Sequence, residues 1–154
     1  MHVMVFLTSL GPLRLEEEGG FLTACLWSGE DGDATAPTST LERAAGQLSE
    51  YLAGRRSVFD IPLRPRGTPF QEAVWQALTT IPYGATWSYR ELAAAVGRPG
   101  AARAVGTANA RNPLSIFIPC HRVIRATGEV GGYGGGVSAK ERLLALEAQH
   151  APRP

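Results

Sequence analysis

The stretch SYRELAAAVGRPGAARAVGTANA, residues 88–110, decides the fold of the second half of the chain. Ser88 can cap a helix and Glu91 completes a capping box three residues later, so a short helix is predicted to begin here and to stop at Gly97. After the glycine-containing turn, a second helix carries arginine and small residues. Two short helices joined by such a turn have the outline of a helix-turn-helix, a motif that binds DNA.

Two further helices are predicted on either side of this motif. Thr68 and Gln71 form a second capping box, with Pro69 at the first helical position. Ser138 and Glu141 form a third, which opens a final helix through KERLLALE. The second half of the chain is therefore expected to be mostly helical.

The first third of the chain has a different pattern. Short apolar or alternating runs at 2–9, 11–18 and 20–28 are separated by glycine-containing turns, which is typical of an antiparallel meander. Helical spacing of apolar residues over 40–54 predicts one helix, which Gly54 can terminate. Cys25, inside the third run, is expected to be a small buried apolar residue.

The predicted fold class is α+β in two lobes. An N-terminal lobe at 1–63 combines the antiparallel sheet with one helix, and a C-terminal lobe at 64–154 is mostly helical and holds the helix-turn-helix. The stretch RRSVFDIPLRPRG links them.

Composition indicates an ordinary globular protein. Of its 154 residues, 44% are hydrophobic and 19% charged, and no apolar run approaches the roughly 20 residues that span a bilayer. The start of the chain has no basic segment and soon becomes acidic, which argues against a signal peptide. Two cysteines do not form a disulfide framework. We expect a cytoplasmic protein with free thiols.

Charge is unevenly distributed along the chain. Eight arginines and only two acids lie between Arg64 and Arg125, whereas the rest of the chain holds seven basic and twelve acidic residues. This basic block fits either a solvated surface or a face that binds phosphates. The second interpretation agrees with the helix-turn-helix.

A second informative stretch is SIFIPCHRVI, residues 115–124. It predicts a short buried strand that stops at Pro119, followed at once by Cys120 and His121. No pair of cysteines or histidines has the spacing of a structural zinc site, and the reducing compartment disfavours a disulfide with Cys25. The thiol of Cys120 is then either a buried bystander or a nucleophile.

A nucleophilic thiol needs a base, and the base needs a group that orients it. Adjacent residues of a strand point to opposite faces, so His121 can serve Cys120 only if the chain turns there or a water bridges them. Glu147, near the end of the final helix, is the candidate that orients His121. From chemistry alone, both interpretations of the thiol stay open.

These residues resemble those of the O6-alkylguanine-DNA alkyltransferase family. IPCHRVI stands between NPLSIF and GGYGGG, and upstream the resemblance includes TPFQEAVWQAL, IPYGATWSYRELAAAVGRP and AARAVGTANARNP, so that it covers about 67–147. The first sixty residues match only the general shape of the family's N-terminal, ribonuclease H-like lobe. The glycine-rich loop does not match the dinucleotide or phosphate-loop fingerprints, so no cofactor is expected.

The resemblance implies a single-turnover repair protein. Cys120 would attack the alkyl carbon on O6 of a flipped guanine in double-stranded DNA, with His121 as its base through a water and Glu147 orienting the imidazole. Asn112 would brace the turn before the cysteine, and Tyr89 would donate a proton to N3 of the guanine and crowd the target phosphate. Arg103 would fill the gap left in the base stack.

Further contacts follow from the same resemblance. The other residues expected at the DNA are Arg98, Ala101, Ala102 and Gly106. The residues expected around the flipped base are Ser115, Arg122, Val123, Tyr133 and Gly134.

Two positions depart from some relatives. Gly134 replaces a serine and Ser115 replaces a proline, which leads us to expect weaker reaction with O6-benzylguanine. The metal-binding cysteines that some relatives carry in the first lobe are missing, so no metal is expected. We expect a monomer in solution. The sequence leaves open whether several molecules bind cooperatively along DNA. The alternatives are an alkyltransferase-like protein that binds damage without repair, or a regulator.

Overall fold

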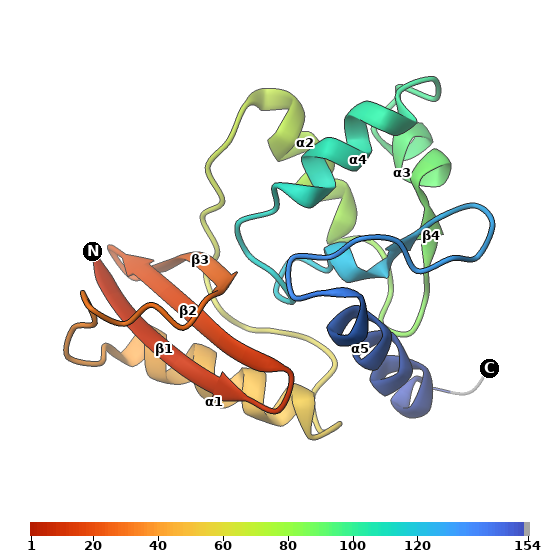
Figure 1. The fold of residues 1–154 in the computed structure, drawn as a ribbon. Coiled ribbons are helices and arrows are strands. Elements are labelled where there is room, and N and C mark those ends of the chain that lie inside the picture. The colour runs from red at the N-terminus through yellow and green to blue at the C-terminus, as the bar shows by residue number, and fades with distance from the viewer. Residues whose placement is uncertain (153–154) are drawn as a thin grey trace. The chain divides into compact units, whose positions relative to one another are not determined.

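The computed structural model describes residues 1–152 and divides them into two compact units (Figure 1). The first unit is Met1–Pro65 together with Pro113–Phe117, and the second is Arg66–Asn112 together with the chain from Ile118 onward. Arg153 and Pro154, at the end of the expected C-terminal lobe, lie outside the described residues. Among residues 1–152 no helix has both the length and the apolar character needed to cross a membrane.

The first unit is built on a three-stranded antiparallel sheet. Its strands, in the order β1-β2-β3, are β1 (His2–Thr8), β2 (Gly11–Glu18) and β3 (Phe21–Trp27). The β2–β3 hairpin turns through Gly19 and Gly20, whose φ angles are +61° and +87°. Positive φ at both central residues is the requirement of a tight hairpin turn that matches the twist of the strands. The predicted meander is confirmed.

Helix α1 (Ser39–Leu52) packs on one face of this sheet (Figure 1). Thr38 caps it by accepting from the backbone N–H of Leu41, and Gly54, with φ +77°, follows its end as predicted. The side chains that it buries at helical spacing are Leu41, Ala44, Leu48 and Tyr51. Cys25 is fully buried in the sheet, as expected of a small apolar residue.

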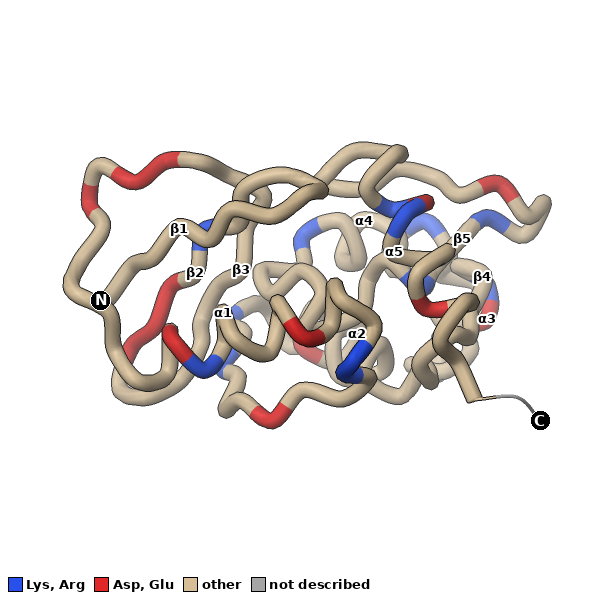
Figure 2. Tube along the Cα trace, turned by 90° about the horizontal axis from the view of Figure 1, so that it is seen from below, with Lys and Arg blue, Asp and Glu red and all other residues tan. Residues whose placement is uncertain are grey.

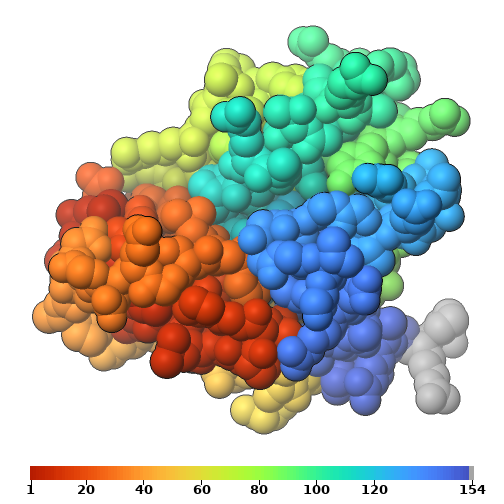
Figure 3. Space-filling view, in the orientation of Figure 1, coloured from red at the N-terminus to blue at the C-terminus, as the bar shows by residue number. Residues whose placement is uncertain are grey.

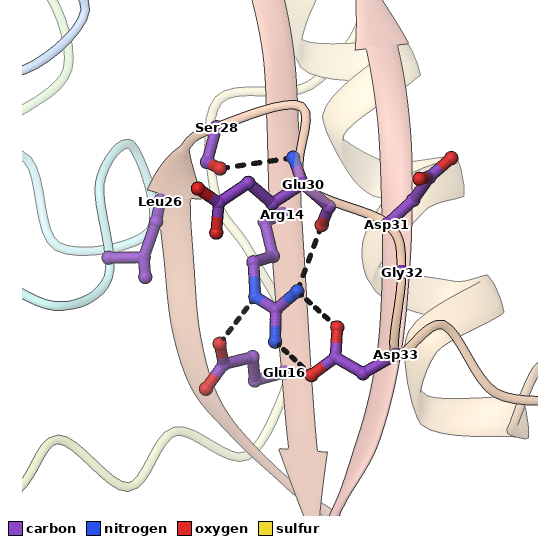
Figure 4. A pocket seen from close by; sticks show the side chains of 8 residues that line it. All are labelled: Arg14, Glu16, Leu26, Ser28, Glu30, Asp31, Gly32 and Asp33. Atoms are coloured by element: carbon purple, nitrogen blue, oxygen red, sulfur yellow. Dashed lines mark hydrogen bonds and ion pairs between the residues drawn. The ribbon is translucent and has the colours of Figure 1, made fainter.

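An ion-pair cluster ties the loop after β3 to the sheet (Figure 4). Arg14 of β2 donates Nε–H to Glu16 at 2.7 Å and two further N–H groups to the carboxylate of Asp33. A fork-to-fork pair of this kind fixes direction as well as distance. The Arg14 guanidinium lowers the pKa of Asp33 below its ordinary value. Acidic residues are frequent along β2 and this loop (Figure 2).

The second unit is mostly helical, as predicted. Its elements are α2 (Pro69–Leu78), β4 (Trp87–Ser88), α3 (Tyr89–Ala95), α4 (Ala102–Ala110), a 3₁₀ turn (Cys120–Arg122), β5 (Val123–Ile124) and α5 (Val137–His150). The capping boxes at Thr68 and Ser88 are both present. Helices α3 and α4 contact each other and α2, which is the arrangement expected of a helix-turn-helix.

The third predicted capping box is wrong. Helix α5 begins at Val137, so Ser138 already lies within its first turn and Gly136, with φ +93°, stands at the cap without a side-chain bond. A hydroxyl inside the helix is past the position from which it can accept from the third residue. The end of the glycine-rich loop therefore sets the start of α5.

The predicted strand at 114–118 is also wrong. The only sheet-like pairing in this segment is an isolated parallel bridge between Leu114 and Cys25, supported by the bond from Ser115 N–H to the Cys25 carbonyl. These contacts group Pro113–Phe117 with the first unit, although the sequence suggested the C-terminal lobe. The lobe boundary after residue 63 and the ribonuclease H-like character of the first lobe stay predictions.

Gly67→Ala is expected to destabilise the second unit. An added Cβ would lie 2.5 Å from Cη2 of the buried Trp75 and 2.6 Å from Oε1 of Gln71, which belongs to the capping box. Overpacking of this kind costs about 1–3 kcal/mol. Gly100→Ala is the control, because nothing lies within 4 Å of its Cβ position. Urea denaturation of the two variants measures the difference, and equal midpoints would contradict the packing argument.

Candidate active site

Tight turns, not a strand, lead to Cys120. Ile116 has φ +73°, which is rare for a β-branched side chain, and the Phe117 N–H donates to the Ser115 carbonyl at 2.9 Å. This is a strained three-residue γ-turn, and a backbone of this kind costs on the order of 1–3 kcal/mol. All residues from Leu114 to Ile118 are buried, which explains why the segment resembles a core strand in the sequence.

A second γ-turn stands directly before the cysteine. Pro119 has φ −80° and ψ 64°, and the Cys120 N–H donates to the Ile118 carbonyl at 2.8 Å. This is the unstrained form of the turn, and the proline ring already favours its φ. The backbone then continues into the 3₁₀ turn Cys120–Arg122. Cys120 and His121 therefore follow each other in a helical turn, which satisfies one of the two conditions that the sequence analysis set for His121 to serve the thiol.

Glu147 of α5 holds His121 by a short hydrogen bond. The distance from Nε2 of His121 to Oε2 of Glu147 is 2.6 Å, and both side chains are almost fully buried. The same carboxylate accepts from Nε and Nη2 of Arg122 at 2.7 and 3.0 Å and from the Gly84 N–H at 3.1 Å. The pairing of His121 with Glu147 that the sequence predicted is thus present in the geometry.

These partners decide the tautomer of His121. An ionised carboxylate can only accept, and the charge of Arg122 favours the ionised form of Glu147. Nε2 of His121 therefore carries the proton of the neutral ring. Nδ1 is unprotonated, and its lone pair can accept a proton as a base does. Burial lowers the pKa of His121 despite the opposing effect of Glu147, so the imidazole is neutral at physiological pH.

Arg122 has a different environment from the one expected. The resemblance assigned it to the substrate pocket, but its guanidinium bonds to Glu147 and, through Nη1, to the Ile81 carbonyl at 2.7 Å. Gly84 completes this arrangement. Its φ is +82°, and an added Cβ would lie 2.5 Å from the Cβ of Ala151 and 3.4 Å from the Glu147 carbonyl.

The thiol of Cys120 is buried and un-ionised at rest. Burial raises its pKa, and three weaker influences oppose this: a hydrogen bond from Asn112, the positive charge of Lys140 and a backbone hydrogen bond. Asn112 also donates from Nδ2 to the Ile118 carbonyl at 2.8 Å. The predicted brace is therefore in place, and it touches both the turn and the thiol.

Lys140, the only lysine of the chain, was missed by the sequence analysis. It is fully buried in the second turn of α5, and its ammonium donates to the Val123 carbonyl at 2.6 Å and to the Gly132 carbonyl at 3.3 Å. A completely buried lysine is rare and needs such partners. It ties the glycine-rich loop to β5 and brings a positive charge to the site, while burial lowers its own pKa.

Two tyrosines flank the site. Tyr89 begins α3 and is partly buried, which raises the pKa of its hydroxyl and keeps it a donor. An added Cβ on Gly106 would lie 3.4 Å from the Tyr89 ring, so Gly106 admits this ring. Tyr133 lies edge-on to His121, with ring centroids 6.5 Å apart. The glycine-rich loop thus reaches His121 through Tyr133, and its expected contact with the flipped base stays a prediction.

The remaining predicted residues lie around α4 and the loop. Arg103 is exposed on α4, Ala101 and Ala102 are partly exposed at its start, and the helix surface is open to view in Figure 3. Arg98 is exposed with its guanidinium 5.5 Å from the Phe70 ring centre. Arginines are spread over the part of the unit that holds α3, α4 and β5 (Figure 2).

Three other residues that the resemblance placed around the flipped base lie in environments that differ from one another. Val123 is fully buried, with its carbonyl bound by Lys140. Gly134 is exposed in the loop, and Ser115 is buried in the segment that belongs to the first unit.

Comparison with known proteins agrees with this geometry. A family model described as the DNA-binding domain of 6-O-methylguanine DNA methyltransferase matches residues 69–149. The methylated-DNA–protein-cysteine methyltransferase of Mycobacterium tuberculosis H37Rv is 45% identical over 157 residues, covering 99% of this chain and 95% of that protein. The constitutive enzyme of that name from Bacillus subtilis is 47% identical over 150 residues, 91% of each chain.

A solved structure shows the same similarity. The crystal structure of Mycobacterium tuberculosis OGT in complex with DNA superposes with a TM-score of 0.89 at 47% identity, covering 99% of this chain and 96% of that one. Similarity of this extent over nearly the whole chain shows that the chain belongs to the methylated-DNA–protein-cysteine methyltransferase family.

Proposed function

We propose that this protein repairs O6-alkylguanine in double-stranded DNA by transferring the alkyl group once and irreversibly to Cys120. The observation that carries the proposal is a neutral His121 that Glu147 holds by a hydrogen bond. His121 directly follows the buried thiol of Cys120 in a helical turn. A nucleophile, a base and an orienting carboxylate are the parts that such a transfer requires. No cofactor is needed, because the thiol itself accepts the alkyl group.

The transfer is a single displacement. The proton of the Cys120 thiol passes to Nδ1 of His121 through a water, and Glu147 stabilises the imidazolium. The thiolate attacks the alkyl carbon, so that an S–C bond forms while the bond between that carbon and O6 breaks. The electron pair of the broken bond stays on the guanine, which takes up a proton from the Tyr89 hydroxyl at N3. The base protonated at N3 becomes guanine when that proton moves to N1, and the proton held by His121 returns to the Tyr89 oxygen through solvent, so that the products are guanine and an S-alkylcysteine.

The substrate base has to leave the helix to reach this site. An alkyl group on O6 inside a duplex cannot meet a buried thiol, and flipping a nucleotide costs a few kcal/mol. The exposed side of α4 would dock in the minor groove, with Arg103 filling the stack and Arg98, Ala101 and Ala102 beside it. Because the minor groove carries little sequence information, this docking suits a protein that searches for damage in any sequence.

The flipped guanine would meet mainly backbone groups. The carbonyls of Cys120 and Val123 can accept from its exocyclic amine, and the Tyr133–Gly134 part of the loop can contact O6. The Val123 carbonyl already accepts from Lys140, but a carbonyl oxygen has two lone pairs. Two buried cysteines that form no disulfide among residues 1–152 also favour a reducing compartment, and we place the protein in the cytoplasm.

Label transfer tests the proposed function directly. Duplex DNA carrying radiolabelled O6-methylguanine should label the protein up to about one methyl group per chain, because the alkylated thiol cannot react again. Cys120→Ala should abolish labelling, whereas Cys25→Ala should retain it. Tight binding of the methylated duplex without any labelling would instead identify a damage-binding protein that does not repair.

Lys140→Met is expected to slow the reaction with free O6-benzylguanine by roughly tenfold at pH 7, which corresponds to about 1.4 kcal/mol. Loss of the charge removes one of the three influences that lower the pKa of Cys120, so the rise of the rate with pH should move to higher pH. Arg142→Met, an exposed charge on the same helix, is the control. A pH profile that coincides with that of the wild type would contradict this role of Lys140.

Folding stability should fall on acidification because of His121. Its pKa is lowered in the folded state, so below about pH 6.5 the unfolded chain binds a proton that the folded chain does not. Stability is therefore complete above that pH and is lost below it, by up to about 1.4 kcal/mol per pH unit. Urea denaturation between pH 7.5 and 5.5 should show a smaller loss for His121→Gln. Equal losses in the two proteins would refute the assignment.

A further inference from the structure

We propose that Asn109 is a positioning residue that ties helix α4 to the backbone carbonyl of Cys120. This inference rests on the proposed function, and it concerns how the helix that docks on DNA is kept in register with the reacting turn. Neither the family motif nor the sequence pattern singled out this residue.

Asn109 and Asn112 form a pair of side-chain amides at the end of α4. Asn109 lies in the last turn of α4 and Asn112 two residues beyond its end, and both are buried. Nδ2 of Asn112 donates to the Ile118 carbonyl at 2.8 Å, and Nδ2 of Asn109 approaches the Cys120 carbonyl at 3.5 Å. The two amides therefore hold the first and last residues of the turn that delivers the thiol.

The contact of Asn109 is long. At 3.5 Å it lies at the outer limit of a hydrogen bond, so a shift of α4 toward the turn by a few tenths of an ångström would strengthen it and the opposite shift would break it. Catalytic hydrogen bonds are often long in the free protein and shorten once the substrate is bound. The strength of the hydrogen bond from Asn109 therefore depends on the position of α4 relative to the turn.

Stability alone does not explain an amide at this position. Oδ1 of Asn109 is buried and accepts no hydrogen bond from any residue in the described range 1–152. A buried polar atom without a partner costs about 1–3 kcal/mol, whereas an apolar side chain of similar volume has no such cost. The amide is retained at the expense of stability, which indicates that its donor is used.

Ala108, the residue before Asn109, attaches the end of α4 to a neighbouring helix. Nε1 of the buried Trp75 donates to the Ala108 carbonyl at 2.9 Å, so the last turn of α4 is attached to α2. The backbone of Asn109 is thereby held in place while its side chain reaches the Cys120 carbonyl. The Cys120 carbonyl accepts from the Val123 N–H as well as from Asn109. In the proposed function the exocyclic amine of the flipped guanine approaches this same carbonyl, so Asn109 orients an acceptor that the substrate uses.

Asn109→Leu separates positioning from stability. We expect its thermal midpoint to equal or exceed that of the wild type, its affinity for unmethylated duplex to be unchanged, and its methyl transfer to be slower by about tenfold. A wild-type transfer rate would overturn the inference, and so would a lowered midpoint with an unchanged rate in the folded fraction. Glu141→Gln, an exposed change on α5 and outside the helix that docks on DNA, should transfer methyl at the wild-type rate.

A change of substrate tests whether Asn109 acts through the Cys120 carbonyl. O6-methylhypoxanthine lacks the exocyclic amine, so its transfer gains nothing from an oriented Cys120 carbonyl. Asn109→Leu should therefore slow the reaction with O6-methylguanine in DNA more than that with O6-methylhypoxanthine. Equal slowing of the two substrates would overturn the role assigned to the carbonyl.

Asn109→Asp decides the matter if the leucine variant does not fold. Its ionised carboxylate repels the Cys120 carbonyl, but the protonated acid can donate to it, and burial raises the pKa of such a carboxyl. The ratio of variant to wild-type rate should therefore rise as the pH falls, and a constant ratio would overturn the inference. If the wild type itself transfers no label, the proposed function fails instead, so the two failures are distinguishable.

Discussion

The buried carboxylate of Glu147 is the interaction on which the rest of the site depends. It accepts hydrogen bonds from His121, from Arg122 and from the Gly84 N–H, so one side chain of α5 joins the thiol turn to the loop after α2. Loss of one partner from a buried pair leaves an uncompensated charge, which costs about 3–5 kcal/mol. The same contacts that hold these segments together fix the proton on Nε2 of His121, so folding and chemistry share one set of bonds.

Around this ion pair, desolvation favours the neutral forms of the other groups. It raises the pKa of Cys120 and lowers those of His121 and Lys140, and at Cys120 it outweighs both the bond from Asn112 and the charge of Lys140. The resting thiol is therefore a poor nucleophile. For a cysteine that is consumed by its first reaction, this is an advantage, because the thiolate forms only when an alkyl carbon is in place to receive it.

Local signals predicted most of the fold, and tertiary contacts explain the errors. The capping boxes at Thr68 and Ser88 depend only on residues three apart, and the structure contains both. The strand expected before Pro119 failed because burial alone does not distinguish a strand from the γ-turn at Ile116, whose strain only the surrounding contacts can maintain. Lys140 was missed for a related reason: helical spacing treats a lysine as solvent-facing, and its two carbonyl partners come from distant segments.

In the proposed function helix α4 has two roles that are usually separate. It has only nine residues, fewer than the roughly 12–15 that a helix needs to be stable by itself, so its position is set by its contacts with α2 and α3. Arg103 is exposed on the helix, and just beyond the helix end Asn112 donates to the Ile118 carbonyl in the turn before the cysteine. Asn109 in the last turn of the helix contacts the Cys120 carbonyl, so a displacement of α4 changes this contact with the reacting turn directly. The distance between docking and chemistry is thus shorter than a separate DNA-binding domain would allow.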